Sequence, residues 1–252
     1  MNLFFRDLCI ALLAAHLLGD FIIQTKKEVE NKHNIWILFR HTGLIALLSW
    51  LLCGLWKAWL IPVIIFISHT LIDLIKSRLK KNGVVPFVLD QIAHFVIIII
   101  LARLIIAVSF PTPGYWIIMF GSAYVKALIL LSGVIFITRV GGFLIGFLLE
   151  PMEKELGAAM QPLPESPPVF AGLKNGAMLI GQLERALILL FYMTGEAGGI
   201  GFLMAAKSIL RYNEVRNRMD KMTAEYIIIG TLMSFGYGIF IAIIVKWTLG
   251  QV

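Results

Sequence analysis

Histidine and aspartate residues four positions apart recur within the first 94 residues of the sequence. On an α-helix this spacing places both side chains on one face, one turn apart, as in helices that offer two ligands to one metal ion. The pairs are His16 with Asp20, His69 with Asp73, and Asp90 with His94. A further histidine, His41, lies near the start of another apolar segment. These seven residues are the candidate metal ligands.

Four imidazoles and three carboxylates form a mixed nitrogen and oxygen ligand set that suits zinc first, with manganese or iron as alternatives. Seven ligands are too many for one tetrahedral site. They predict either two divalent ions bridged by a carboxylate, or one ion whose ligands are held by the other carboxylates. Either centre activates water for hydrolysis, and an aspartate accepts the proton, with Asp20, Asp73 and Asp90 as the catalytic candidates.

Polar residues next to these pairs are candidates for hydrogen bonds to the ligands or to a substrate. They are Gln24, Gln91 and Lys76. Solvated helix ends are the alternative for the glutamines, and a cytoplasmic anchor is the alternative for the lysine. The whole set could also form a proton or ion pathway, or interhelical hydrogen bonds. A metal is favoured because each unpaired intramembrane charge costs about 2.5–3.5 kcal/mol, and an ion offsets several at once.

The composition indicates which elements carry these residues. The chain has 252 residues, of which 59% are hydrophobic and 15% charged, and its mean hydropathy is +0.88. Soluble domains have roughly 45–50% apolar and about 25% charged residues. A soluble enzyme, a disordered protein and a secreted disulfide scaffold are therefore excluded. The net charge of +7 indicates cytoplasmic loops, not nucleic-acid binding. We expect an all-α, polytopic transmembrane helix bundle.

Eight apolar segments are expected, and they cover residues 3–23, 35–55, 59–75, 85–108, 115–149, 174–194, 198–210 and 225–249. The fifth exceeds one span, so we expect it to tilt, to extend beyond the bilayer or to begin with a short kinked piece near Gly121. The seventh is short and glycine-rich, so a re-entrant turn is an alternative to a crossing. An acidic, proline-rich cytoplasmic loop at 150–174 lies in the C-terminal half (111–252), which follows the metal-site half (1–110).

Basic residues cluster after the first, third and seventh segments. The positive-inside rule then predicts a multi-pass protein of the bacterial inner (plasma) membrane, with both termini outside. This topology brings the ends of the first four segments that carry the histidines and aspartates to one layer near the cytoplasmic surface.

Three strings carry a resemblance to a known family: His16-Leu-Leu-Gly-Asp20-Phe-Ile-Ile-Gln24, His69-Thr-Leu-Ile-Asp73-Leu-Ile-Lys76 and Asp90-Gln91-Ile-Ala-His94. They resemble an uncharacterised bacterial inner-membrane family, a domain of unknown function with some members encoded beside a SatD-type regulator. The C-terminal stretches at 181–185, 201–208 and 225–231 also resemble this family, so the resemblance is expected to cover most of the chain. More distantly, the chain is similar to membrane-bound metal-dependent hydrolases. It lacks their Pro-Asp-x-Asp-His and His-Arg-Gly-x-Thr-His stretches, so this similarity implies only a type of site.

The second half has no histidines but carries intramembrane charges. Glu184 and Arg185 are adjacent in one segment, and Lys207 and Arg139 lie in others. A structural network is favoured, with Glu184 paired to Lys207 and Arg185 bound to Glu196 or to a backbone carbonyl. The alternative is that Arg139, Arg185 and Lys207 contact an anionic headgroup of the substrate.

The leading functional hypothesis is a metal-dependent hydrolase that acts at the cytoplasmic side on an amphipathic substrate, such as a phospholipid or a polyprenyl phosphate. One alternative is a metal-ion transporter, although the outer halves of the first four segments are apolar. Another is a non-catalytic membrane sensor with a cytoplasmic regulatory partner. Iron-dependent lipid oxidation is a further possibility. The sequence indicates no oligomeric state.

Overall fold

The computed structural model consists mainly of helices and describes residues 3–32, 34–79, 83–108, 112–159, 176–215 and 221–252. No strand occurs within these ranges, so the predicted all-α class is confirmed. The chain divides into two compact units, Met1–Ile135 with Thr248–Val252, and Phe136–Trp247. The first unit contains all seven candidate ligands.

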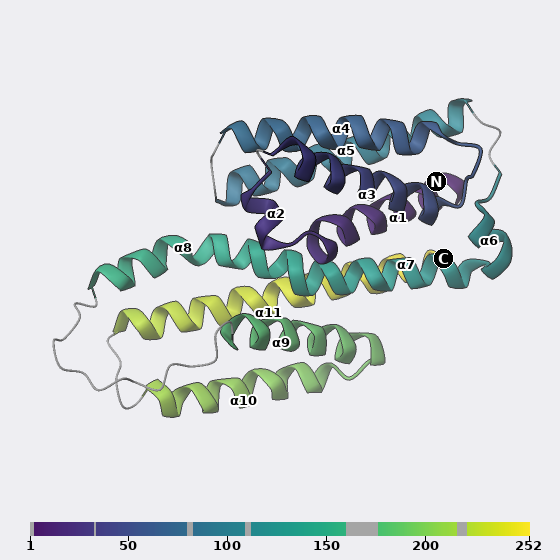
Figure 1. The fold of residues 1–252 in the computed structure, drawn as a ribbon. Helices are drawn as coiled ribbons and strands as arrows, with labels where there is room; N and C mark the ends of the chain where they lie inside the picture. Colours follow the sequence, from purple (N-terminus) through teal and green to yellow (C-terminus); the bar gives the residue numbers. More distant parts are fainter. Residues whose placement is uncertain (1–2, 33, 80–82, 109–111, 160–175, 216–220) are drawn as a thin grey trace. The chain divides into compact units, whose positions relative to one another are not determined.

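Four membrane-type helices of the first unit run side by side (Figure 1). The elements of this unit are α1 (Leu3–Leu18), the π-helix η1 (Gly19–Ile23), α2 (Lys26–Glu30), α3 (Ile35–Cys53), α4 (Leu60–Leu79), α5 (Val84–Val108), α6 (Tyr115–Phe120) and α7 (Ser122–Ile135). Helix α1 packs against α3, α5 and α7, and α4 packs against α3 and α5. The helices that carry the ligands are therefore direct neighbours.

Helix α3 shows how local sequence sets the ends of an element. The Asn34 side chain accepts a hydrogen bond from the Trp36 N–H, which satisfies a donor at the helix N-terminus. At the other end Gly54 adopts φ +62°, the left-handed conformation that commonly terminates a helix. Aromatic residues gather at this C-terminal end, where Trp116 Nε1 donates to Leu51 O and Tyr124 Oη to Leu52 O. Such residues are typical of a membrane–water interface.

One end of the four-helix arrangement is filled by a mainly aliphatic core. Its buried members come from the middle of α1, the first half of α4, the second half of α3 and α5, and Leu128 of α7. They include Leu12, Ile45, Ile61, Ile65 and Leu101. The histidines and aspartates occupy the opposite halves of the same helices, so apolar packing and polar cluster lie at different depths of the bundle.

The second unit contains the π-helix η2 (Phe136–Val140), α8 (Gly141–Ala159), α9 (Gly176–Thr194), α10 (Ala197–Val215) and α11 (Lys221–Leu249). Helix α10 is continuous, so the re-entrant turn considered for 198–210 is not present. Helix α8 continues through Pro151 to Ala159, whereas an irregular loop was expected from residue 150. The proline-rich part of that loop lies outside the described residues.

Six helical stretches in the described part of the chain are long and apolar enough to cross a membrane. They are Ile35–Cys53, Leu60–Leu79, Val84–Val108, Ser122–Ala158, Gly176–Thr194 and Lys221–Leu249. The expected short piece before the long fifth segment is confirmed as α6, which ends at Gly121 with φ +58°. The other two expected segments are α1 with η1, and α10, whose apolar part Ala197–Ile209 is shorter. A crossing number of eight stays a prediction.

Candidate metal centre

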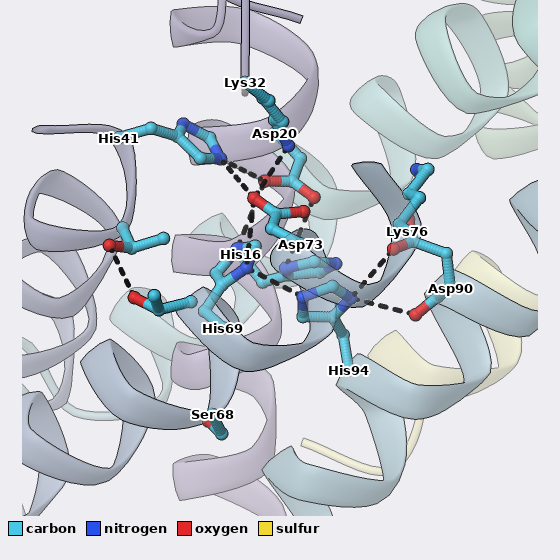
Figure 2. A network of polar contacts seen from close by, with 12 residues as sticks. His16, Asp20, Lys32, His41, Ser68, His69, Asp73, Lys76, Asp90 and His94 are labelled. Carbon is cyan, nitrogen blue, oxygen red and sulfur yellow. Dashed lines mark hydrogen bonds and ion pairs between the residues drawn. The ribbon is translucent and has the colours of Figure 1, made fainter. Parts of the chain in front are cut away.

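The imidazoles and carboxylates of the predicted pairs point toward one another from four helices and form one buried cluster (Figure 2). The structure brings together all seven residues, which are His16, Asp20, His41, His69, Asp73, Asp90 and His94. The side chain of Asp20 is 8% exposed and that of Asp73 only 1%. Charges this well buried require compensation by partners, protons or ions.

A π-helix positions Asp20. The α-helical pattern of α1 ends at Leu18, and η1 widens the following turn, a feature that recurs at functional sites. Gly19 lies directly against the Ile45 side chain, so that a Cβ at this position would overlap with it. This close approach of η1 to α3 lets Asp20 Oδ1 come within 3.1 Å of His41 Nε2.

A threonine pair joins α3 to α4 beside the ligands. The hydroxyl oxygens of Thr42 and Thr70 lie 3.0 Å apart, and each threonine directly follows a histidine of the cluster. Thr42 is completely buried. The contact therefore fixes the register in which His41 faces His69, whose ring centroids are 5.4 Å apart.

A chain of hydrogen bonds assigns the imidazole tautomers. His94 Nδ1 lies 2.8 Å from the backbone oxygen of Asp90, which only accepts, so Nδ1 carries the proton and Nε2 a lone pair. His94 Nε2 lies 2.8 Å from His69 Nδ1, which must then donate. In neutral His69 the lone pair therefore falls on Nε2.

This His69 lone pair faces a carboxylate oxygen. His69 Nε2 lies 3.3 Å from Asp20 Oδ1 and is buried without a hydrogen-bond partner among the described residues. Two electron-pair donors at this distance repel each other unless a proton or a metal ion lies between them. His41 Nε2 approaches the same Asp20 oxygen, so a cation here would have a third ligand.

Lysines compensate two of the three carboxylates. Lys32 Nζ donates to Asp73 Oδ2 and Lys76 Nζ donates to Asp90 Oδ2, each at 2.7 Å. The ion pairs of Asp20 within the described residues involve only histidines, namely His16, His41 and His69. The place where positive charge is lacking is therefore beside Asp20.

Three overlapping trios of ligand atoms lie within 4.8 Å of one another: His16–His69–His94, Asp20–His41–His69 and Asp73–Asp90–His94. Because a neutral imidazole has a single lone pair, His69 can serve only one of its two trios at a time. The tautomer chain assigns it to the trio with Asp20 and His41. The lysines already balance Asp73 and Asp90, so the geometry favours one ion over a centre that uses all seven ligands.

A groove of about 510 Å³ lies beside this trio. We call it the His41 groove; its lining residues are Ile23, Gln24, Glu28, Arg40, His41, Gly43, Leu44 and Leu47. Its volume is in the range of small-molecule sites, roughly 300–1,000 Å³. The trio thus has a neighbouring space for a ligand.

The flanking polar residues differ in their positions. Gln91 Oε1 lies 3.3 Å from His16 Nε2, and Lys76 binds Asp90, so both contact the cluster. Gln24 lines the His41 groove instead. Lys32 is the contact that sequence reasoning missed, because it belongs to a charged loop and appeared only as part of a cytoplasmic basic cluster. Its four-carbon stem lets it reach a buried carboxylate from there.

The charges of the second unit form the structural network that the sequence favoured. Lys207 Nζ binds Glu184 at 2.6 Å. Arg185 Nε and Nη2 donate to the carbonyls of Ile137 and Thr138 in η2, at 2.7 and 3.0 Å. A π-helix leaves backbone carbonyls available for such partners. Since Arg185 and Lys207 are engaged in this way, the structure supports the network over contact of these two residues with an anionic headgroup, whereas Arg139 is exposed.

Replacing Arg185 with methionine is expected to destabilise the second unit. The change removes three hydrogen bonds of a buried cation, including one from Nη1 to Ser234 Oγ, and each such bond contributes about 1.5–3 kcal/mol. Thermal unfolding and limited proteolysis in detergent would measure the loss. Lys246→Met removes an exposed cation that donates to the Tyr192 carbonyl and serves as the control. Equal stability of the two variants would contradict the structural role.

In a comparison with known proteins, the part of the chain that carries the cluster matches a protein-family model. Residues 8–118 match a family described as "Protein of unknown function (DUF3307)", so the match does not extend to the C-terminal stretches in which a resemblance was expected. This range includes all seven clustered residues as well as Lys32 and the His41 groove. No curated protein and no solved structure matches the chain. The family supplies no activity, so the function has to be inferred from the geometry.

Proposed function

We propose that the protein is a membrane-embedded, metal-dependent hydrolase that holds one divalent ion, preferably zinc, at Asp20, His41 and His69. The observation that supports this most directly is the buried His69 Nε2, which has no hydrogen-bond partner among the described residues and faces Asp20 Oδ1 at 3.3 Å. A metal ion satisfies both groups and His41 together. It also supplies the positive charge that Asp20 lacks.

Two imidazoles and one carboxylate are a ligand set typical of catalytic zinc, which keeps further positions open for water and substrate. The bound ion supplies an activated water molecule. Asp73 is suited to accept the proton, because its Oδ2 lies 3.7 Å from His41 Nε2 and 3.8 Å from His69 Nδ1 without belonging to the trio. Lys32 holds this carboxylate in place from the loop side.

The location supports an amphipathic substrate. Basic residues cluster at the end of the bundle that carries the centre, and the aromatic residues around Trp116 mark the opposite interface. We therefore place the centre on the cytoplasmic side of a bacterial inner membrane, with both termini outside. His41 follows Ile35, the first residue of α3, by six residues, or about 9 Å of helix, so it lies below the cytoplasmic surface but within reach of a lipid headgroup.

Metal transport receives less support from the structure. A transit pathway needs polar groups that continue beyond the site toward the other side of the membrane. In the described part of the first unit, that region is filled by the aliphatic core around Ile45, Ile61 and Leu101. A sensor that binds metal without turnover requires no such pathway and is separated from a hydrolase by the assay below.

Iron-dependent lipid oxidation is a second candidate, because two histidines and one carboxylate also form the facial triad of non-haem iron oxygenases. The same trio at Asp20 supports it. The identity of the bound ion separates the two reactions. Similarity to membrane-bound hydrolases and a link to a SatD-type regulator stay predictions.

The test is to purify the protein in mild detergent without chelator, measure metals per chain, and assay it on phosphate-ester lipids in mixed micelles. We expect about one zinc ion per chain and release of inorganic phosphate or of a water-soluble head group, both lost after chelation and restored by zinc. Bound zinc without turnover on any phospholipid or polyprenyl phosphate would favour the sensor. Absence of metal, even after reconstitution, would overturn the proposal and favour a proton on His69.

A further inference from the structure

The His41 groove combines an apolar floor with a polar end. Arg40, Leu44 and Leu47 are separated by four and three residues, so they form a single stripe along α3, with Gly43 beside it. Leu44 and Leu47 are 36% and 47% exposed, and Ile23 of η1 is 39% exposed. In a membrane helix such exposed aliphatic side chains face lipid. The apolar part of the groove therefore opens toward the hydrocarbon region.

The polar end presents an arginine with free donors. Arg40 Nη2 pairs with Glu28 Oε1, yet the Arg40 side chain is 70% exposed. A guanidinium has five N–H donors, so most of them remain available to an anion. The other carboxylate oxygen of Glu28, Oε2, is held by the Thr25 N–H and hydroxyl at 2.7 and 2.9 Å. The backbone N–H of Thr25 lowers the pKa of Glu28, so this carboxylate is ionised at neutral pH and fixes Arg40 at the groove.

A second donor lies deeper in the groove. The amide nitrogen Nε2 of Gln24 is buried and has no hydrogen-bond partner within the described residues. Gln24 and His41 line the same groove, and His41 is a ligand of the proposed ion. A buried donor without a partner costs free energy unless a ligand or water satisfies it. Donors without acceptors at this end, next to a hydrocarbon-lined floor, match an amphiphile with an anionic head.

We propose that the His41 groove binds one hydrocarbon chain of a phosphate-headed lipid along Leu44 and Leu47, with its phosphate at Arg40 and Gln24. Arginine suits phosphate because its planar fork donates two parallel hydrogen bonds. That this lipid is the substrate rests on the proposed function, since the groove brings its head to the side of His41. The groove itself is a binding site whether or not turnover occurs.

Photo-crosslinking tests the site directly. The purified protein is incubated with phosphatidic acid that carries a diazirine in one acyl chain, and with the matching diacylglycerol, which lacks the phosphate. We expect labelling of the α3 peptide that contains Leu44 and Leu47, with a roughly tenfold preference for phosphatidic acid, as a charged hydrogen bond to phosphate implies. Equal labelling by both probes would overturn the assignment of the phosphate to Arg40.

Two matched pairs of variants separate the parts of the proposal. Leu47→Trp fills the groove and should abolish labelling of this peptide, whereas Ile67→Trp, at a 53% exposed position on α4, should not. Arg40→Gln should remove the preference for phosphatidic acid, whereas Arg78→Gln, an exposed arginine on α4, should preserve it. Labelling that persists in Leu47→Trp would overturn the groove.

Metal content is measured in the same preparations, so that failure of this proposal is distinct from failure of the hydrolase. Zinc without labelling of α3 contradicts the lipid site alone. Labelling that responds to Leu47→Trp in a protein without zinc supports the lipid site and contradicts the metal-dependent function alone.

Discussion

Replacing His69 with alanine is expected to abolish metal binding while the protein still inserts into the membrane. His69 belongs to two of the three ligand trios, and its Nε2 is the buried atom that faces Asp20. Loss of an outer-shell partner alone costs about 10–100-fold in metal affinity, so loss of this ligand should cost more. Elemental analysis of detergent-purified protein would measure metal per chain, and size-exclusion chromatography would report folding.

The adjacent residue provides a control for this change. Ser68→Ala removes a polar side chain from the same turn of α4, whose hydroxyl donates to the Ile64 carbonyl and does not contact the proposed ion. It should retain the metal. Because a cavity at His69 could disturb packing, His69→Gln is made in parallel, since it retains volume and polarity. A His69 variant that keeps both full metal content and activity would contradict the centre, whichever substrate it acts on.

Replacing Asp73 with asparagine is expected to leave the metal in place and to lower turnover by about 10²–10⁴-fold, the usual contribution of a general base. Asp73 lies beside the trio that holds the ion but is not one of its members. Asparagine retains the shape and can still accept a hydrogen bond from Lys32, but it does not accept a proton. The release of phosphate and the metal content are measured on the same sample.

An aspartate outside the cluster serves as the control for Asp73. Asp7 lies near the other end of α1, where it pairs with Arg6, and Asp7→Asn should be fully active. Full activity in Asp73→Asn would exclude the proposed base. Loss of metal in Asp73→Asn would also contradict this role, because it would show that Asp73 is itself a ligand and that the ion lies in another trio.

The sequence by itself determined the class of the protein and the membership of the cluster. Its apolar runs are long enough to cross a bilayer as helices, in which every backbone polar group is paired within its own segment. The four-residue spacing of His16 with Asp20 and of His69 with Asp73 places each pair on one helix face. The alternation of basic and uncharged loops predicts the direction in which each helix crosses the membrane, and these directions place the histidines and aspartates at one depth. These inferences depend only on local periodicity and on the direction of each helix.

Which of the clustered residues can act together was decided only by the tertiary structure. The π-helix that carries Asp20 depends on the close approach of Gly19 to Ile45 of another helix, so no local pattern predicts it. The tautomer of His69 follows from its contact with His94, 25 residues away. Such contacts fix where the lone pairs point. Spacing and topology therefore suggested seven candidate ligands for one ion or two, whereas the contacts in the structure led us to propose one ion at three of them.

The ion pairs of Lys32 and Lys76 and the His41 groove could likewise not be predicted from the sequence. In the sequence Lys32 resembles any other basic residue of a loop, but in the structure its ammonium lies 2.7 Å from Asp73. Leu44 and Leu47 resemble ordinary lipid-facing residues until η1 and α2 form the other wall of the groove. The ion pair and the groove each depend on side chains from separate elements that come close together only in the folded protein. Helix periodicity specifies a face, but only packing specifies what that face meets.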